Sequence, residues 1–489
     1  MSWKETAEPV LSRMPGVERP EGHVPFRQKL GWTAGVLVLY FFLTNVFIYG
    51  LGQGSSDAFG QFRTILAGGQ GTILQLGIGP IVTASIILQL LGGADLLGLD
   101  TENDPRDQVL YQGLQKLLVV VMVCLTGLPM VFAGNFLRVD TQVAQSLGIG
   151  VTGVQWLMFA QIFVGGILIL FMDEVISKWG VGSGIGLFII AGVSQRLIGG
   201  LFSVPNITGN TPGFFYSWYA IITGQTGLGS VLGSQGIQAL LIGPGQILFL
   251  FTTVFIFVVV VYAESVRVEI PLSHARVKGA RGRFPVKLIY ASVLPMILVR
   301  ALQTNVQFLG RILNAQLASM PAWLGVYTNG QPVGGLFYYL APIYNYRDWM
   351  WFAANPAGEP IDILIRIAID LTFMIIGGAI FAIFWVETTG MGPESTAQQI
   401  QNSGMQIPGF RKSPGVIEKV LERYIPQVTV IGGALVGALA VMANMLGTIA
   451  QVSGTGLLLT VSITYKLYEE IAEEQMMEMH PMMRQMFGD

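Results

Sequence analysis

Charge, cysteine and histidine are all scarce in this chain of 489 residues, and each scarcity excludes a class of protein. Only 11% of the residues are charged while 52% are hydrophobic, a balance outside that of a soluble globular domain of this length. The single cysteine, Cys124, lies in an apolar run and leaves no disulfide framework or cysteine-based metal site. The net charge of -2 gives no sign of nucleic-acid binding. The composition therefore predicts a protein whose solvent is a lipid bilayer.

Catalytic and cofactor-binding motifs are missing as well. The three histidines, His23, His274 and His480, are far apart, and no phosphate-binding loop with a following Lys and Ser or Thr is present. The glycine-rich run 180–186 superficially resembles a dinucleotide loop, but an apolar run follows it and no strand precedes it, so we interpret it as tight helix packing. We expect no enzyme, no metal site and no cofactor.

What the chain has in abundance is long, continuous apolar runs, which favour helices over a β-barrel. The first 30 residues are polar and contain proline, so the first run is expected to be a stable span and not a cleavable signal peptide. We predict an all-α polytopic membrane protein with ten transmembrane helices, at residues 31–50, 74–93, 114–134, 153–172, 183–200, 246–262, 288–308, 362–386, 426–443 and 452–468.

The distribution of Lys and Arg orients these spans. Most of the 27 basic residues fall on the side of the termini, whereas only Arg63, Arg138, Arg311 and Arg347 fall on the other side. By the positive-inside rule both termini are expected in the cytoplasm.

Segments outside the spans divide the remaining chain. Residues 1–30 are expected to hold an amphipathic helix at the cytoplasmic interface, and residues 469–489 a cytoplasmic tail. The charge-free, glycine-rich segment 201–245 is expected to be an external linker, either a floppy insertion or a segment that dips into the membrane. Two basic cytoplasmic loops, 263–287 and 387–425, hold most of the hydrophilic residues.

The second span has an unusual beginning. The segment Asp57 to Leu66 is helical in pattern but too short to cross a bilayer, and the glycine-rich hinge 68–71 separates it from the crossing segment. A broken helix at membrane depth is tolerated only where it is buried in protein or lines a cavity. An external re-entrant loop without a role is the alternative interpretation.

Four motifs make the chain recognisable. They are GIGPIVTA at 77–84, GSGIGLF at 182–188, AESVRVEIPL at 263–272 and GTGLLL at 454–459. In this order and at these spans, they resemble the SecY family, the channel subunits of the Sec protein translocon, in its archaeal and eukaryotic branch. The resemblance covers nearly the whole chain.

The resemblance implies a protein-conducting channel that translocates unfolded polypeptides and releases transmembrane segments sideways into lipid. It implies two inverted halves, 31–200 and 246–468, around a pore, and a plug at 57–68. It also implies a single-span SecE/gamma-type partner, a small beta-type subunit, signal sequences and nascent chains, and the ribosome. The short tail and the archaeal-like loops favour an archaeal plasma membrane, and the endoplasmic reticulum is the alternative. The expected plug residues are Asp57, Ala58, Phe59, Gly60, Gln61, Phe62, Arg63, Thr64, Ile65 and Leu66.

A ring of aliphatic side chains suits such a pore, because a narrow dry constriction blocks ions by dewetting and yields around a moving chain. Carried over from the family, the pore ring is Ile78, Val82, Ile185, Ile189, Ile297 and Leu459. Without the resemblance, ordinary helix packing or lipid contact would explain all six.

A lateral gate between spans two and three and spans seven and eight follows from the same resemblance. Thr83, Gln303, Thr304 and Asn305 are the polar candidates for this seam, although such residues also serve as plain interhelical contacts. Arg300 and Asp370 lie at similar depth on spans seven and eight, so we hypothesise that their ion pair holds the gate closed. The alternatives are a pair of Asp370 with Arg366, or snorkelling to water.

Cationic loops bind RNA phosphate. Within this family, the basic loops are expected to dock the ribosome, whereas an isolated basic cluster would favour anionic lipid. The expected contacts are Arg276, Lys278, Arg281, Arg283, Lys287 and Arg411. A secondary transporter, also built from inverted repeats and broken helices, is the alternative for the whole chain.

Overall fold

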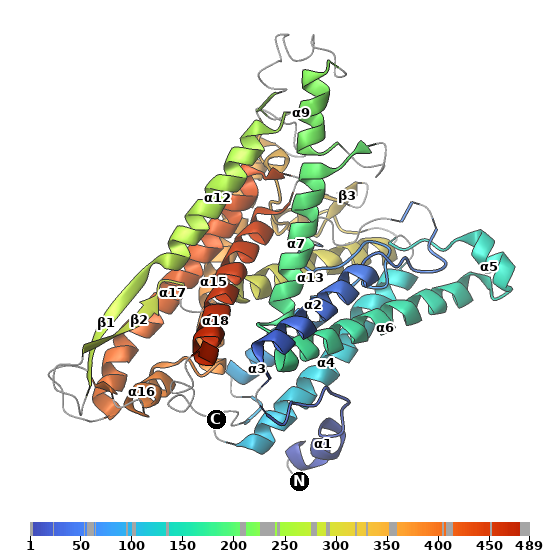
Figure 1. Ribbon diagram of the computed structural model, residues 1–489. Helices are drawn as coiled ribbons and strands as arrows, with labels where there is room; N and C mark the ends of the chain where they lie inside the picture. The colour runs from blue at the N-terminus through green and yellow to red at the C-terminus, as the bar shows by residue number, and fades with distance from the viewer. Residues whose placement is uncertain are drawn as a thin grey trace.

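The computed structural model of the protein is a helical bundle, with ten long helices among the described residues (Figure 1). The structure describes residues 3–22, 24–52, 54–55, 63, 65–93, 96–99, 104–133, 136–205, 212–224, 240–241, 245–274, 281–289, 294–317, 320–328, 331–351, 359–402, 405–406, 414–449 and 452–479.

Each predicted span overlaps one helix of the structure. These helices are α2 (Phe26–Leu43), α3 (Gly79–Gly93), α4 (Pro105–Phe132), α6 (Gly150–Trp179), α7 (Gly184–Phe202), α12 (Ile247–Ser265), α13 (Leu294–Gln316), α15 (Pro360–Thr388), α17 (Pro414–Leu446) and α18 (Gly454–Met479). The shorter helices are α1 (Trp3–Leu11), α5 (Thr141–Leu147), α9 (Phe214–Ile222), α14 (Leu336–Tyr339), the 3-10 helix η2 (Tyr346–Asp348) and α16 (Pro393–Asn402).

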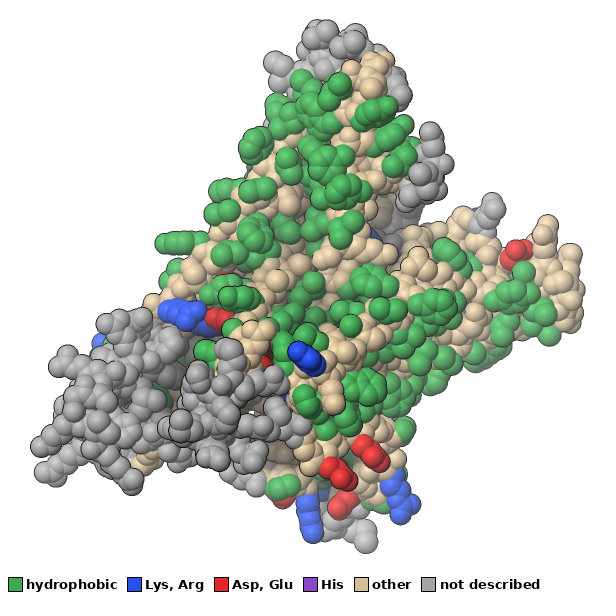
Figure 2. Space-filling view, viewed as in Figure 1, with side chains coloured by type: hydrophobic (Ala, Val, Ile, Leu, Met, Phe, Trp, Pro, Cys, Tyr) green, Lys and Arg blue, Asp and Glu red, His purple; other side chains and the backbone are tan. Residues whose placement is uncertain are grey.

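The surface matches a membrane protein. In Figure 2, hydrophobic side chains cover most of this face, and charged side chains gather mainly toward the end that carries α1. Among the described residues, six helices are long and apolar enough to span a bilayer, namely α4, α6, α7, α12, α15 and α17. The other helices of the bundle carry more polar residues or are shorter; α13, for example, buries Arg300, Gln303 and Thr304 inside the protein. Polar groups within a membrane are expected on such interior faces.

Two groups of helices make up the bundle. In Figure 1, α2, α4 and α6 lie on one side, and α12, α15, α17 and α18 on the other. The groups meet where α7 packs against α18 and where α3 packs against α13 and α15. The halves of the molecule therefore contact each other along two separate lines.

Small residues bring the helices close together. A Cβ atom on Gly378 of α15 would lie 2.5 Å from the carbonyl oxygen of Gly433 of α17, and a Cβ on Gly433 would lie 2.5 Å from the carbonyl oxygen of Gly378. A Cβ on Gly186 would lie 2.8 Å from Ile463 of α18, which fits our interpretation of the 180–186 run as helix packing.

The N-terminal segment packs on the protein. Leu11 at the end of α1 is buried, and a Cβ on Gly113 of α4 would lie 2.6 Å from the carbonyl oxygen of Leu11. Lys4 pairs with Asp107 at 2.8 Å. In the structure, part of the apolar face of α1 therefore covers the N-terminal end of α4, which the amphipathic pattern alone does not reveal.

A small sheet joins the two predicted loops, of which 263–287 carries six Lys or Arg against two Glu, and 387–425 carries four of each sign. Strands β1 (Arg267–His274) and β2 (Arg281–Lys287) form an antiparallel hairpin, and β5 (Met405–Gln406) from the second loop pairs with the end of β1. A second hairpin pairs β3 (Val326–Thr328) with β4 (Gln331–Gly334). The predicted linker contains α9, whose Phe215, Tyr219 and Ile222 are exposed.

Candidate pore and lateral gate

The six predicted ring residues come from helices α3, α7, α13 and α18 and from the residue directly before α3, and they lie in one hydrophobic cluster. Five of them are at most 2% exposed, and Ile185 is partly buried against the same cluster. The second span begins later than predicted, because α3 starts at Gly79 and not at Leu74. Ile78 therefore precedes the helix, and its carbonyl accepts the amide of Val82 at 3.0 Å, which keeps these two residues one turn apart.

The end of the predicted plug packs into this cluster. Ile65 and Leu66 are 1% and 3% exposed, and the carbonyl of Leu66 accepts the amide of Ile78 at 2.8 Å. Arg63 is also buried, and its Nη1 donates to the carbonyl of Gln75 at 3.1 Å. The remaining predicted plug residues, 57–62 and 64, lie outside the described residues.

Two residues that the sequence analysis missed hold this segment in place. The hydroxyl of Tyr40 donates to the carbonyl of Ala67 at 2.9 Å, and its ring stacks on Phe188 with centroids 5.0 Å apart. The Oε1 of Gln75 accepts the amide of Gly71 at 2.6 Å. A polar Gln in the crossing segment was a visible signal, but nothing in the pattern assigns it to the plug.

Gly77 permits the close approach between the plug end and α3. Its φ of +54° lies in the left-handed region, and a Cβ there would lie 2.1 Å from the carbonyl oxygen of Leu66. No other residue type fits this position without displacing the Leu66 segment.

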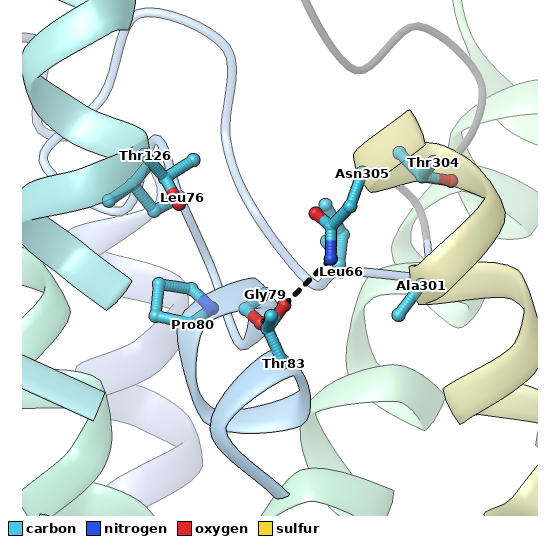
Figure 3. Close-up of a pocket in the computed structure, with 9 residues that line it drawn as sticks. All are labelled: Leu66, Leu76, Gly79, Pro80, Thr83, Thr126, Ala301, Thr304 and Asn305. Atoms are coloured by element: carbon cyan, nitrogen blue, oxygen red, sulfur yellow. Dashed lines mark hydrogen bonds between the residues drawn. The ribbon is translucent and has the colours of Figure 1, made fainter. Parts of the chain in front are cut away.

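Thr83 and Asn305 meet across the predicted seam. The Nδ2 of Asn305 on α13 donates to Oγ1 of Thr83 on α3 at 3.0 Å, as Figure 3 shows. Both side chains line a small pocket between α3, α4 and α13, together with Leu66, Leu76, Gly79, Pro80, Thr126, Ala301 and Thr304. This contact joins the two halves beside the plug.

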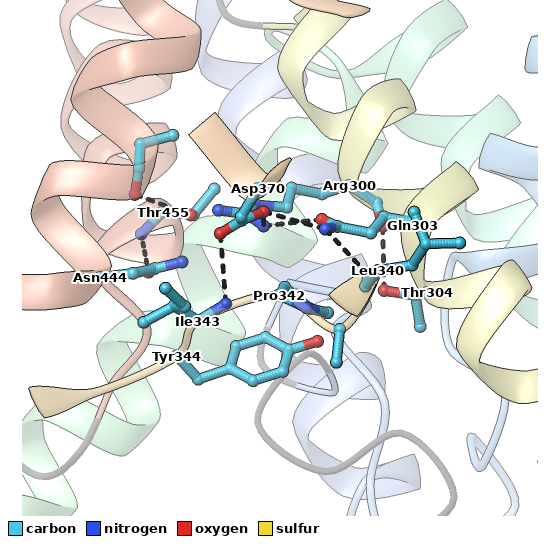
Figure 4. A network of polar contacts seen from close by, with 12 residues as sticks. Arg300, Gln303, Thr304, Leu340, Pro342, Ile343, Tyr344, Asp370, Asn444 and Thr455 are labelled. Carbon is cyan, nitrogen blue, oxygen red and sulfur yellow. Dashed lines mark hydrogen bonds and ion pairs between the residues drawn. The ribbon is translucent and has the colours of Figure 1, made fainter. Parts of the chain in front are cut away.

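Arg300 and Asp370 form a buried ion pair, with Arg300 Nη1 and Asp370 Oδ1 3.1 Å apart (Figure 4). Gln303 accepts from Arg300 at 2.7 Å and donates to Asp370 at 2.9 Å. The amide of Ile343 donates to the second oxygen of Asp370 at 3.2 Å. The predicted contact is thus present, but both partners belong to the same wall, α13 and α15, and not to opposite sides of the seam.

The segment that follows α14 is fixed to this wall. Arg366 donates to the carbonyls of Ala341 and Pro342, both at 2.9 Å. Tyr339 donates to Asp362 at 2.9 Å, and this hydrogen bond raises the pKa of the tyrosine above its ordinary value. Arg366 is therefore engaged with this segment. Gln303, which was predicted at the seam, instead forms hydrogen bonds with Arg300 and Asp370 in the buried network.

The predicted docking surface is described only at its base. Lys287 contacts Glu469 of α18 in an ion pair. Arg276, Lys278 and Arg411 lie outside the described residues, as do the side chains of Arg281 and Arg283. The pairing of β5 with β1 nevertheless brings the two basic loops together in one sheet.

Two family models match consecutive parts of the chain. The family model described as SecY matches residues 72–468, and the model described as the plug domain of Sec61p matches residues 38–71, a range that includes the predicted plug residues. Protein translocase subunit SecY of Haloarcula marismortui is 76% identical over the full length of both chains.

Solved structures give the same result. A structure described as a protein-conducting channel superposes with a TM-score of 0.78 at 39% identity, covering 97% of this chain and 98% of that one. Sec61 in the canine ribosome–channel complex superposes with a TM-score of 0.75, also at 39% identity, covering 97% of this chain and 98% of that chain. Relatives of this kind form channels, which settles the choice against a secondary transporter. This chain therefore belongs to the SecY family, the multi-pass membrane subunits of the protein translocase that form a protein-conducting channel.

Proposed function

We propose that Ile78, Val82, Ile185, Ile189, Ile297 and Leu459 form the constriction of this channel, and that the segment ending at Leu66 closes it on the external side. One observation supports this most directly: the plug end bonds to a ring residue, since the amide of Ile78 donates to the carbonyl of Leu66 at 2.8 Å. Five of the six ring residues are also at most 2% exposed. A dry aliphatic constriction opposes ion passage by dewetting, and it offers no polar group that would hold a passing side chain.

A photo-crosslinker in place of Val82 tests this assignment. We expect it to capture a translocating chain that is stalled in the channel, because the moving chain must displace Val82 and its neighbours. Val164 of α6 provides the matched control, since it is 53% exposed on the outer surface of the bundle. Capture from position 164 with none from position 82 would contradict the proposal.

The lateral gate is assigned to the contact between α3 and α13, supported by the hydrogen bond between Asn305 and Thr83. An interhelical hydrogen bond in a membrane contributes about 0.6 kcal/mol on average. A contact of this strength favours the closed wall without locking it. Separation of Thr83 from Asn305 would open a lateral path through which an apolar signal helix leaves for lipid.

The sheet that joins the two basic loops is assigned to ribosome docking, with Arg276, Lys278, Arg281, Arg283 and Arg411 as contacts. The similar Sec61 structure contains a bound ribosome, and RNA phosphate attracts such a surface. Lys287 belongs to the base of the hairpin through its pair with Glu469, so its role is to position this surface.

Neutralising Arg276 and Lys278 to Gln tests the docking surface. We expect ribosome co-sedimentation to weaken, with the slope of log affinity against log salt reduced by about 0.7 to 0.9 for each lost phosphate contact. Membrane integration should stay intact, which separates the ribosome from anionic lipid as the partner of these residues. An unchanged salt slope would contradict the assignment.

The remaining partners follow from the family. A SecE/gamma-type single-span subunit and a small beta-type subunit are proposed to complete the complex, which receives signal sequences and nascent polypeptides. An archaeal plasma membrane with both termini in the cytoplasm fits the basic residues on the side of the termini and the archaeal source of the relative.

A further inference from the structure

The last helix, α18, continues well beyond the pore. Leu459 lies fully buried in the hydrophobic cluster that holds the predicted pore ring, and α18 runs without interruption to Met479. Glu469, ten residues after Leu459, therefore lies about 15 Å farther along the axis. One continuous helix, α18, therefore connects the proposed constriction to the proposed cytoplasmic surface.

The first anchor of this extension is the base of the β1–β2 hairpin. Arg267 and Lys287 are register partners at the open end of the hairpin. Arg267 Nη2 lies 3.1 Å from Oε1 of Glu469, and Lys287 pairs with the other oxygen of the same carboxylate. One carboxylate thus holds both strands.

Tyr465 strengthens this anchor one turn earlier on α18. Its hydroxyl accepts from Arg267 Nη2 at 3.3 Å, and Lys287 Nζ lies 5.8 Å from its ring centroid. Residues four apart share one face of a helix, so Tyr465 and Glu469 present a combined surface to the hairpin. The side chains are partly exposed, with Arg267 at 39% and Glu469 at 25%.

The second anchor reaches the other half of the molecule. Glu474 pairs with Lys29 in the first turn of α2, and the two side chains are 22% and 20% exposed. Because α2 belongs to the N-terminal half, the extension of α18 contacts the C-terminal hairpin at Glu469 and the N-terminal half at Glu474.

We infer that Glu469 and Glu474 make the extension of α18 a brace, which positions the ribosome-docking hairpin relative to both halves and to the pore ring. The inference rests on the proposed docking function. Its consequence is that a ribosome bound to the hairpin acts on a helix that carries Leu459. Partly exposed ion pairs contribute little to stability, so the brace positions the hairpin without fixing it permanently.

Limited trypsin cleavage tests the first anchor without a ribosome. In proteoliposomes, Glu469→Gln is expected to raise cleavage after Lys287 about fivefold, because the hairpin base is released. Glu470→Gln is the matched control, since the ion pair that Glu470 makes among the described residues is with Lys466 of its own helix, at 3.9 Å. Glu469→Asp, which keeps the charge, should restore part of the protection. Equal cleavage of Glu469→Gln and Glu470→Gln would overturn the inference.

Co-translational translocation tests the transmission to both halves. Glu469→Gln and Glu474→Gln are each expected to lower the yield about threefold with ribosomes still bound, while Glu470→Gln matches the parent. Unchanged yields in both variants would overturn the brace. If the double variant Arg276→Gln/Lys278→Gln leaves ribosome binding intact, the docking proposal fails. The trypsin comparison still shows whether Glu469 anchors the base of the hairpin.

Discussion

Replacing Asp370 with Asn is expected to lower the free energy of unfolding of the channel by about 3 kcal/mol or more, because it leaves Arg300 as a buried cation without a counter-charge. Both side chains are at most 1% exposed, so water cannot compensate. The substitution keeps the shape of the side chain, and the loss therefore reports charge and not packing. Thermal unfolding in detergent measures it.

The double variant Arg300→Met/Asp370→Asn provides the control. It leaves no unpaired charge, and it is expected to recover most of the stability that Asp370→Asn loses. A double variant as unstable as the single one would show that the network matters through its hydrogen bonds with Gln303 and Ile343 and not through the ion pair.

The single variant Asp370→Asn also distinguishes two roles for the ion pair of Arg300 and Asp370. If the pair holds the gate closed, Asp370→Asn eases the translocation of substrates with weak signals. If it only fixes α13 to α15, the signal requirement stays unchanged while stability falls. Asn305→Leu is the reference for a true seam contact, because it removes the bond to Thr83 and should ease weak signals. The geometry favours the second role, since Arg300 and Asp370 lie in one wall.

The spans were predictable from the sequence because bilayer thickness sets a length for apolar runs. The broken second span was visible as well, since the glycine-rich hinge 68–71 interrupts its pattern. Its true start was not visible. The stretch from Leu74 to Ile78 is mostly apolar, yet it is irregular because it packs against the plug end and not against its own helix.

Contacts between distant segments were the least predictable part. Equal depth on neighbouring helices indicated that Arg300 and Asp370 meet, but it did not show that Gln303 would join them. The basic loop 263–287 was visible in the charge pattern, whereas the hairpin that it forms and its attachment to Glu469 were not. Such pairs depend on how distant helices are placed in the tertiary structure, which no local sequence pattern shows.

Replacing Gly77 with Ala is expected to unseat the plug and make the idle channel leak ions. The new methyl group would lie 2.1 Å from the carbonyl oxygen of Leu66, and the left-handed backbone at φ +54° costs an Ala about 1 to 2 kcal/mol. The Leu66 segment cannot retreat freely, since its carbonyl also accepts the amide of Ile78. Loss of that bond costs about 1 kcal/mol more.

Gly79→Ala is the matched control, two residues away in the same segment. Its Cβ would meet only the side chain of Leu66, at 3.4 Å, which is an ordinary contact. Ion flux from proteoliposomes that hold the idle channel measures both variants. We expect a leak from Gly77→Ala and none from Gly79→Ala. Vesicles that stay equally tight with both would show that the seal does not depend on the position of Leu66, and that the aliphatic ring alone excludes ions.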